Sequence, residues 1–121
     1  MSQEDLLQSA IRIVSSTRFD LSNEKRLQEQ IANAFLSAGI HFLREYHLGD
    51  GDIPDFLLHD GVVLECKLHG ASKIGVFRQL QRYAKHQIVS SIILVTNLSM
   101  GLPNQIEGKP AYFVSLSRAW L

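Results

Sequence analysis

The chain has 121 residues, of which 45% are hydrophobic and 20% are charged, a composition typical of one globular domain with a substantial core. No apolar run approaches the length of a membrane span, the acidic N-terminus lacks a signal-peptide pattern, and the single Cys66 excludes an intramolecular disulfide and a cysteine-rich zinc site. We therefore expect a cytoplasmic protein with no membrane partner, folded as a single domain over residues 1–121.

The formal net charge of zero conceals an uneven distribution of charge along the chain. Eleven of the twelve carboxylates lie in residues 1–65, whereas residues 66–121 hold seven of the twelve Lys and Arg side chains and only one acid, Glu107. If the two halves stay apart in the fold, an acidic pocket will lie beside a basic wall. If the halves interleave, the charges will mix, and the sequence leaves both arrangements open.

Hydrophobic periodicity and turn residues predict the elements in chain order. Helices are predicted at about residues 3–16, 23–38 and 73–86, the second with Ser22 as its N-cap and Gly39 as its stop. Strands are predicted at residues 41–48, 53–58, 62–68, 91–96 and 111–116, with a turn at 49–52 and a loop at about 100–108. The resulting α-α-β-β-β-α-β-β order indicates an α/β fold in which helices flank a central mixed sheet.

The strands on either side of residues 59–61 carry the most informative side chains. A three-residue hairpin loop with Gly at its left-handed position pairs Leu58 with Val62. Asp55 then falls directly opposite Glu65, and opposed residues have Cβ atoms ~4.5–5.5 Å apart. Because a like charge disfavours ionisation, we expect at least one of these two carboxyl groups to have a raised pKa.

The register of this hairpin decides whether the two carboxylates meet. A two-residue turn at Asp60 and Gly61 would place Asp55 opposite Cys66 and would turn Glu65 to the other face. The apolar pattern favours the three-residue loop, because that register gathers the apolar side chains of both strands on one dry face. Cys66 then belongs to the dry face as a small buried hydrophobic residue.

Two carboxylates and an ammonium group converge on the charged face of this hairpin. Asp55, Glu65 and the backbone carbonyl of Cys66 form a partial shell suited to Mg²⁺, for which Mn²⁺ can substitute. Lys67 shares the face of Glu65 and is placed to orient a water molecule or to oppose charge on a phosphate. Metal-assisted phosphodiester hydrolysis needs this set. The alternative is a plain α/β domain whose charged strand face is solvated.

Two helices supply further candidates for the same site. Glu24 lies at the edge of the core-facing stripe of the second helix, where it is either another metal ligand, directly or through water, or a first-turn acid favoured by the helix dipole. Gln79 and Tyr83 share one face of the third helix and are placed to support the carboxylates. The cations of that helix would contact DNA phosphates, unless they only form a solvated face; they are Lys73, Arg78, Arg82 and Lys85.

Together these motifs resemble the PD-(D/E)xK nuclease superfamily. Pro54-Asp55 matches its PD, Glu65-x-Lys67 its (D/E)xK, Gln79-x-x-x-Tyr83 its Q-x-x-x-Y element, and Glu24-x-x-x-Gln28 the opening motif of its small VRR-NUC and Holliday-junction-resolvase-like members. The resemblance covers about residues 22–97 as a nuclease core and leaves 1–20 as an N-terminal helical extension. It implies a restriction-endonuclease-like fold and Mg²⁺-dependent cleavage of DNA.

We therefore expect a metal-dependent deoxyribonuclease of phage, mobile-element or repair type. A small nuclease that cuts both strands needs two sites, so a symmetric homodimer is expected as well. The alternative is a DNA-binding or assembly module that keeps the nuclease fold without catalysis. The intact set of Asp55, Glu65 and Lys67 argues against that alternative, since a module under no catalytic demand would more easily lose one of them.

Overall fold

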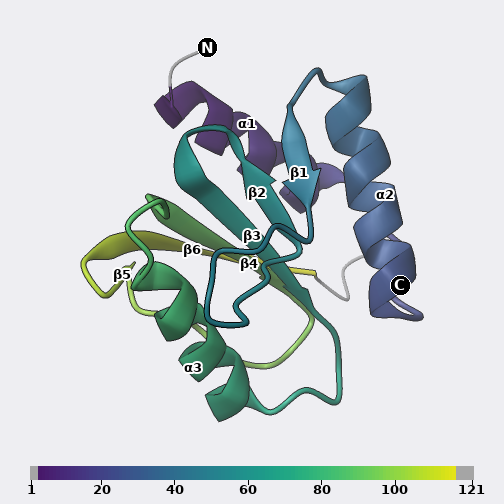
Figure 1. Ribbon diagram of the computed structural model, residues 1–121. Coiled ribbons are helices and arrows are strands. Elements are labelled where there is room, and N and C mark those ends of the chain that lie inside the picture. The colour runs from purple at the N-terminus through teal and green to yellow at the C-terminus, as the bar shows by residue number, and fades with distance from the viewer. Residues whose placement is uncertain (1–2, 117–121) are drawn as a thin grey trace.

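The computed structural model describes residues 3–116, in which helices pack on a central sheet (Figure 1). The helices are α1 (Gln3–Ser16), α2 (Glu24–Ser37) and α3 (Lys73–Ala84). The strands are β1 (Phe42–Arg44), β2 (Phe56–Leu58), β3 (Val62–Lys67), β4 (Ser91–Thr96), β5 (Gln105–Ile106) and β6 (Lys109–Ser115), and a single turn of 3-10 helix, η1 (His59–Gly61), joins β2 to β3. Within the described residues, no helix has the length and apolar character needed to cross a membrane.

The sheet has the strand order β1-β2-β3-β4-β6-β5 and is mixed, as the sequence predicts. The strands β1, β2 and β3 pair antiparallel, β3, β4 and β6 pair parallel, and β5 closes the far edge antiparallel to β6. The parallel pair β3 and β4 is joined by a crossover through α3, because parallel neighbours need a long connection. The carboxyl ends of β3, β4 and β6 therefore meet at one edge of the sheet.

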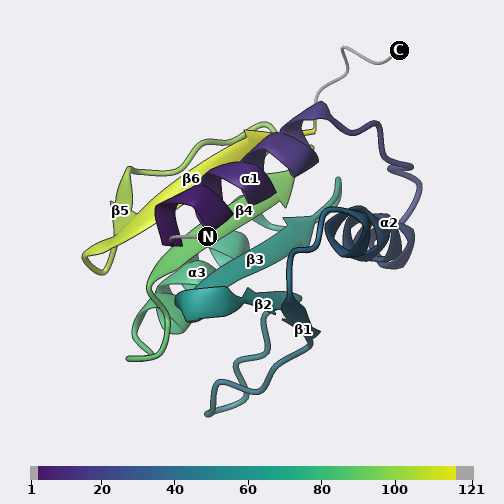
Figure 2. The ribbon, with the colours of Figure 1, turned by 90° about the horizontal axis from the view of Figure 1, so that it is seen from above.

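Helices cover both faces of the sheet, with α1 and α3 on opposite sides in the view from above (Figure 2). One apolar cluster joins α1 and α2 to Val62, Leu64 and Cys66 of β3, and the other joins α3 to Val63. Alternation along β3 then places Glu65 on the α3 side. The core also includes α1 and β6, both of which lie outside the 22–97 span of the resemblance.

Several boundaries differ from the prediction for local reasons. The strand predicted at 41–48 ends at Arg44, because Glu45 takes a positive φ of 51° and donates its N–H to the carbonyl of Asp55. The N-cap of α2 is Asn23 rather than Ser22, since the Asn23 side chain accepts from the Arg26 N–H. The loop predicted at 100–108 contains β5, and α3 ends at residue 84 rather than 86.

The hairpin adopts the register that the three-residue loop predicts. Phe56 pairs with Leu64, and the same register continued by one residue sets Asp55 opposite Glu65. In the loop, Asp60 and Gly61 both have positive φ values, of 61° and 79°. The carbonyl of Gly61 also accepts a hydrogen bond of 2.8 Å from the N–H of Ser90, which ties the hairpin to the start of β4.

Gly61→Ala should strongly destabilise the protein, because a Cβ at this position would lie 2.0 Å from the carbonyl oxygen of Ile88. Left-handed strain and overpacking together predict a loss of about 2–5 kcal/mol in the free energy of unfolding. Gly108→Ala is the matched control, since Gly108 has a φ of 75° but no heavy atom within 4 Å of its added Cβ. Urea unfolding of both variants measures the difference, and equal losses would mean that the contact with Ile88 is not close in solution.

Candidate functional site

The backbone of the hairpin holds Asp55 and Glu65 against each other where β2 begins and β3 approaches its end. The Asp55 N–H donates to Glu65 Oε1 at 3.1 Å, and the Cys66 N–H donates to Asp55 Oδ2 at 2.8 Å. Each carboxylate is thus bonded to the main chain of the opposite strand. Glu65 is only 2% exposed, while Asp55 is half-buried. The pair is therefore fixed in position and accessible mainly through Asp55.

Two further side chains contact Glu65 from the α3 face of the sheet. Lys67 Nζ lies 3.2 Å from Glu65 Oε2, which confirms that the two side chains share a face. The Tyr83 hydroxyl lies 3.3 Å from Glu65 Oε1 and 3.2 Å from the carbonyl oxygen of Ile53, and it can donate to either. Tyr83 is fully buried, so α3 supports the carboxylate as the helix spacing predicts.

Burial raises the pKa of both carboxyl groups. The pKa of Asp55 rises to about 6, mainly by desolvation and further by the charge of Glu24, while the Cys66 N–H and Lys67 oppose the rise. The pKa of Glu65 rises to about 7 by desolvation first and by the charge of Asp55 second. The sequence predicts a raised pKa, but it attributes the rise to the like charge rather than to burial. Near neutral pH the pair therefore carries fewer than two full negative charges.

Glu24 begins α2 and lies near the end of β3. Its Oε2 accepts a hydrogen bond of 3.4 Å from the Leu68 N–H, and its charge acts on the pKa of Asp55. Across residues 3–116, however, no three His, Cys, Asp or Glu side chains are gathered closely enough to hold a metal ion by themselves. The direct or water-mediated role of Glu24 as a ligand stays a prediction.

Arg44 on β1 is a neighbour of the site that the sequence did not reveal. Its guanidinium stacks over the Phe56 ring at 4.9 Å and donates to Gln28 Oε1 at 3.3 Å. Its positive charge lowers the pKa of Asp55. The residue lies on a short edge strand, and no local pattern connects that strand to Asp55 before the hairpin is folded.

Asp52 is the second neighbour that the sequence missed, since its place in a Gly-Asp-Gly-Asp turn suggested only a loop. The structure buries it to 7% exposure and surrounds it with α3 side chains and the residues after them. Arg82 Nε donates to Asp52 Oδ1 at 3.2 Å, and a 2.8 Å hydrogen bond joins His86 Nε2 to Asp52 Oδ2. Arg82, predicted to contact DNA, therefore has a buried carboxylate as a partner, and here the acidic and basic halves of the chain interleave.

The remaining predicted residues of α3 divide into two groups. Gln79 is half-buried and lines a groove beside Lys67 and Arg82. The other predicted DNA-binding cations are exposed: Lys73 and Arg78 on α3, and Lys85 directly after it. No acid occurs in the sequence of α3. A basic surface thus lies on the same helix that supports Glu65.

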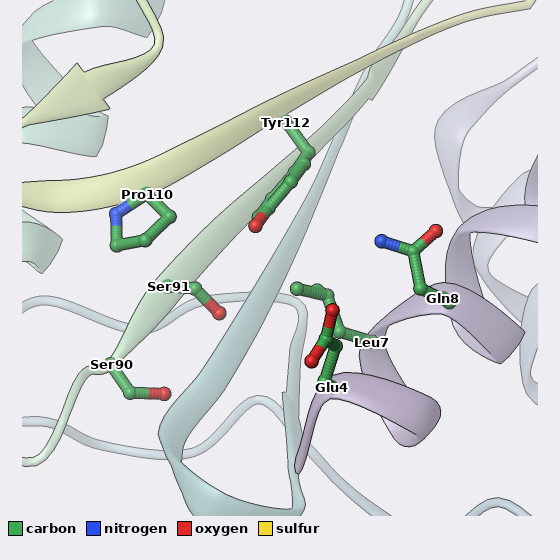
Figure 3. Close-up of a pocket in the computed structure, with 7 residues that line it drawn as sticks. All are labelled: Glu4, Leu7, Gln8, Ser90, Ser91, Pro110 and Tyr112. Atoms are coloured by element: carbon green, nitrogen blue, oxygen red, sulfur yellow. The ribbon is translucent and has the colours of Figure 1, made fainter.

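A separate hollow of about 420 Å³ lies toward the opposite end of the parallel strands (Figure 3). It is lined by Glu4, Leu7, Gln8, Ser90, Ser91, Pro110 and Tyr112. The hydroxyl of Ser91 is buried there and finds no hydrogen-bond partner within residues 3–116. Because Ser91 pairs with Val62 at the start of β3, this hollow is remote from Glu65.

The carboxylate pair, Lys67 and Tyr83 thus form one connected set of contacts at the carboxyl end of β3. Open α/β sheets commonly bind their ligands outside the carboxyl ends of their strands. No protein-family model, no curated protein and no solved structure matches this chain.

Proposed function

We propose that this protein is a metal-dependent deoxyribonuclease that hydrolyses phosphodiester bonds. The observation that carries the proposal is the opposed pair of half-buried Asp55 and buried Glu65, with the Lys67 ammonium 3.2 Å from Glu65. Burying two carboxylates together is costly unless a positive charge compensates them. Lys67 supplies one such charge and lowers the pKa of both groups, but burial still raises these pKa values to about 6 and about 7.

The donor set fits Mg²⁺ in chemical type, because both side chains offer the hard oxygen atoms that this ion prefers. Asp55, Glu65 and the Cys66 carbonyl would hold the ion, with Mn²⁺ as a substitute, and waters would complete a shell that the protein only begins. When bound, such an ion polarises a phosphoryl oxygen and lowers the pKa of a bound water. Glu24 is the residue proposed to extend the shell, through water or directly.

The side chains of the site would act on the phosphate and on one another. Lys67 is placed to donate to the attacking water or to the charge that develops on the phosphate. Tyr83 and the Asp55 N–H hold Glu65 Oε1, so that the carboxylate does not reorient during the reaction. Gln79 lies beside Lys67 and would support the substrate, and the exposed cations of α3 would hold the DNA backbone.

This function agrees with the resemblance to the PD-(D/E)xK superfamily. On that basis we also propose that the α/β fold is restriction-endonuclease-like. A phage, mobile-element or repair nuclease acting in the cytoplasm is the role that it suggests. Cleavage of both strands of a duplex would require two copies of the site, and therefore a symmetric homodimer.

A non-catalytic DNA-binding or assembly module is the second candidate, and one observation favours it. Both oxygens of Glu65 already accept from protein donors, Oε1 from the Asp55 N–H and Tyr83 and Oε2 from Lys67. A carboxylate satisfied in this way can serve structure alone. The two candidates differ in whether a divalent ion displaces any of these contacts.

Cleavage of labelled nucleic acids by the purified chain tests the proposal. Linear duplex, branched junction, single-stranded DNA and RNA are each incubated with Mg²⁺, Mn²⁺ or a chelator. We expect cleavage of DNA that requires the ion and that disappears in Asp55→Asn. Binding of DNA without cleavage under every condition would instead support the module.

A further inference from the structure

A groove of about 310 Å³ runs between Lys67 and one side of α3. Its wall on α3 is a stripe at helical spacing, and this stripe consists of Ser72, Gly75, Val76, Gln79 and Arg82. Gly75 adds no side chain to it, and a Cβ built there would meet only Ser72 atoms, at 3.4 Å. The groove therefore lies where the helix surface carries no side chain at Gly75.

The polar groups of this groove suit an anion. Lys67 of β3 and Arg82 of α3 bring positive charge from two different elements, and Gln79 adds an amide about one helical turn before Arg82. No acidic side chain lines the groove among the residues that the structure describes. Lys67 contacts Glu65 as well, so an anion in the groove would lie next to the carboxylate pair.

Arg82 is held in a defined orientation by a buried partner. Its Nε donates to Asp52, whose second carboxylate oxygen is bonded to His86. A guanidinium has five N–H donors, so this contact leaves the donors of both Nη atoms for another acceptor. Because Asp52 is buried and bonded from two sides, Arg82 would lose little conformational freedom when it binds a ligand.

From these contacts we infer that the groove is a phosphate-binding subsite, in which Arg82 and Gln79 receive the phosphate group next to the one that is cleaved, while Lys67 acts on the cleaved one. The inference rests on the proposed function for the identity of the substrate as a polynucleotide. Asp52 is then a positioning residue, which acts on the substrate only through Arg82. Arg78, on the same helix, does not line the groove. It would contact the phosphates of the DNA backbone only in a general way.

Titration of the metal-free, ¹⁵N-labelled protein with inorganic phosphate tests the subsite without any cleavage. We expect saturable shifts of the Ser72, Gly75 and Gln79 amide signals and of the Arg82 Nε–H signal. Arg82→Ala should weaken phosphate binding about tenfold or more, as is typical for a lost hydrogen bond to a charged group. The phosphate affinity of Arg82→Lys should fall between those of the parent protein and Arg82→Ala, since Lys keeps the charge but lacks the planar guanidinium with its several donors. Arg78→Ala, the matched control, should leave the affinity within about twofold.

Two more variants separate positioning from charge. Asp52→Asn should weaken phosphate binding in the parent but have no further effect in an Arg82→Ala background, because contacting residues are not additive. Gly75→Leu should fill the groove and weaken binding while raising the thermal midpoint, since Leu favours helix more than Gly. If Asp52→Asn fails to fold, Gly75→Leu still tests the groove.

The outcomes distinguish this inference from the proposed function. If phosphate leaves the groove signals unmoved while the parent protein cleaves DNA, the subsite is wrong and the nuclease stands. If phosphate binds the groove but no DNA is cleaved with either ion, the subsite stands and the nuclease is wrong. Equal effects of Arg78→Ala and Arg82→Ala on phosphate affinity would overturn the subsite, because they would indicate a diffuse basic surface.

Discussion

Lys67→Ala should remove most of the cleavage activity while leaving Mn²⁺ binding and DNA binding largely unchanged. Lys67 is proposed to act on the attacking water and on the charge that develops at the phosphate, and not to hold the ion. Loss of one preorganised group of this kind costs ~10²–10³ in rate, or ~2.7–4 kcal/mol of transition-state stabilisation. Single-turnover cleavage, measured beside direct binding of Mn²⁺ and DNA, gives the comparison.

The pH of this experiment matters because Lys67 also lowers the pKa of both Asp55 and Glu65. Its removal would leave them more protonated near neutral pH, so the rates should be compared well above their pKa values of about 6 and about 7. Arg78→Ala is the matched control and should behave in the opposite way, with weaker DNA binding and a smaller salt dependence. A Lys67→Ala variant that cuts DNA at the parent rate would rule out this mechanism and favour the binding module.

In the metal-free protein, the free energy of unfolding should fall as the pH rises from about 4 through about 7. Folded Asp55 and Glu65, with pKa values of about 6 and about 7, retain protons that the unfolded chain has released, since the ordinary values are 3.8 and 4.5. The native state binds more protons in this window, so its stability decreases with rising pH. Each group contributes a loss on the order of 3 kcal/mol. Urea unfolding at a series of pH values in a chelator measures the slope.

Asp55→Asn should flatten that slope and stabilise the metal-free protein above pH 7, because it removes one of two charges buried together. The same variant should lose the stabilisation that Mg²⁺ gives the parent protein, ~2.7 kcal/mol at a hundredfold excess over the dissociation constant. Asp20→Asn is the control, and its effect on the pH dependence of stability should have the opposite sign, since hydrogen bonds to Ser22 lower the pKa of exposed Asp20. Equal Mg²⁺ stabilisation of Asp55→Asn and the parent protein would exclude Asp55 as a ligand.

Local patterns in the chain were sufficient for the hairpin that carries the site. The alternation of apolar residues and the Gly61 loop predict the pairing of Phe56 with Leu64, and the structure confirms it. The helix at residues 3–16 and the strand at 91–96 also have the predicted bounds. These features depend on residues close in sequence, where side-chain period and backbone preference act directly.

Contacts between distant segments were decided by the tertiary structure alone. The bonds of Asp52 to Arg82 and His86 join residues 30 and 34 positions apart, and no local pattern marks Asp52 as more than a turn residue. Burial, rather than the like charge, became the main cause of the raised pKa values of Asp55 and Glu65. Desolvation depends on how several elements close over one point, and a linear pattern does not specify how they close. The sequence could therefore identify the two carboxylates and their pairing across the hairpin, whereas their burial and the contact of Tyr83 with Glu65 depended on the packing of distant elements.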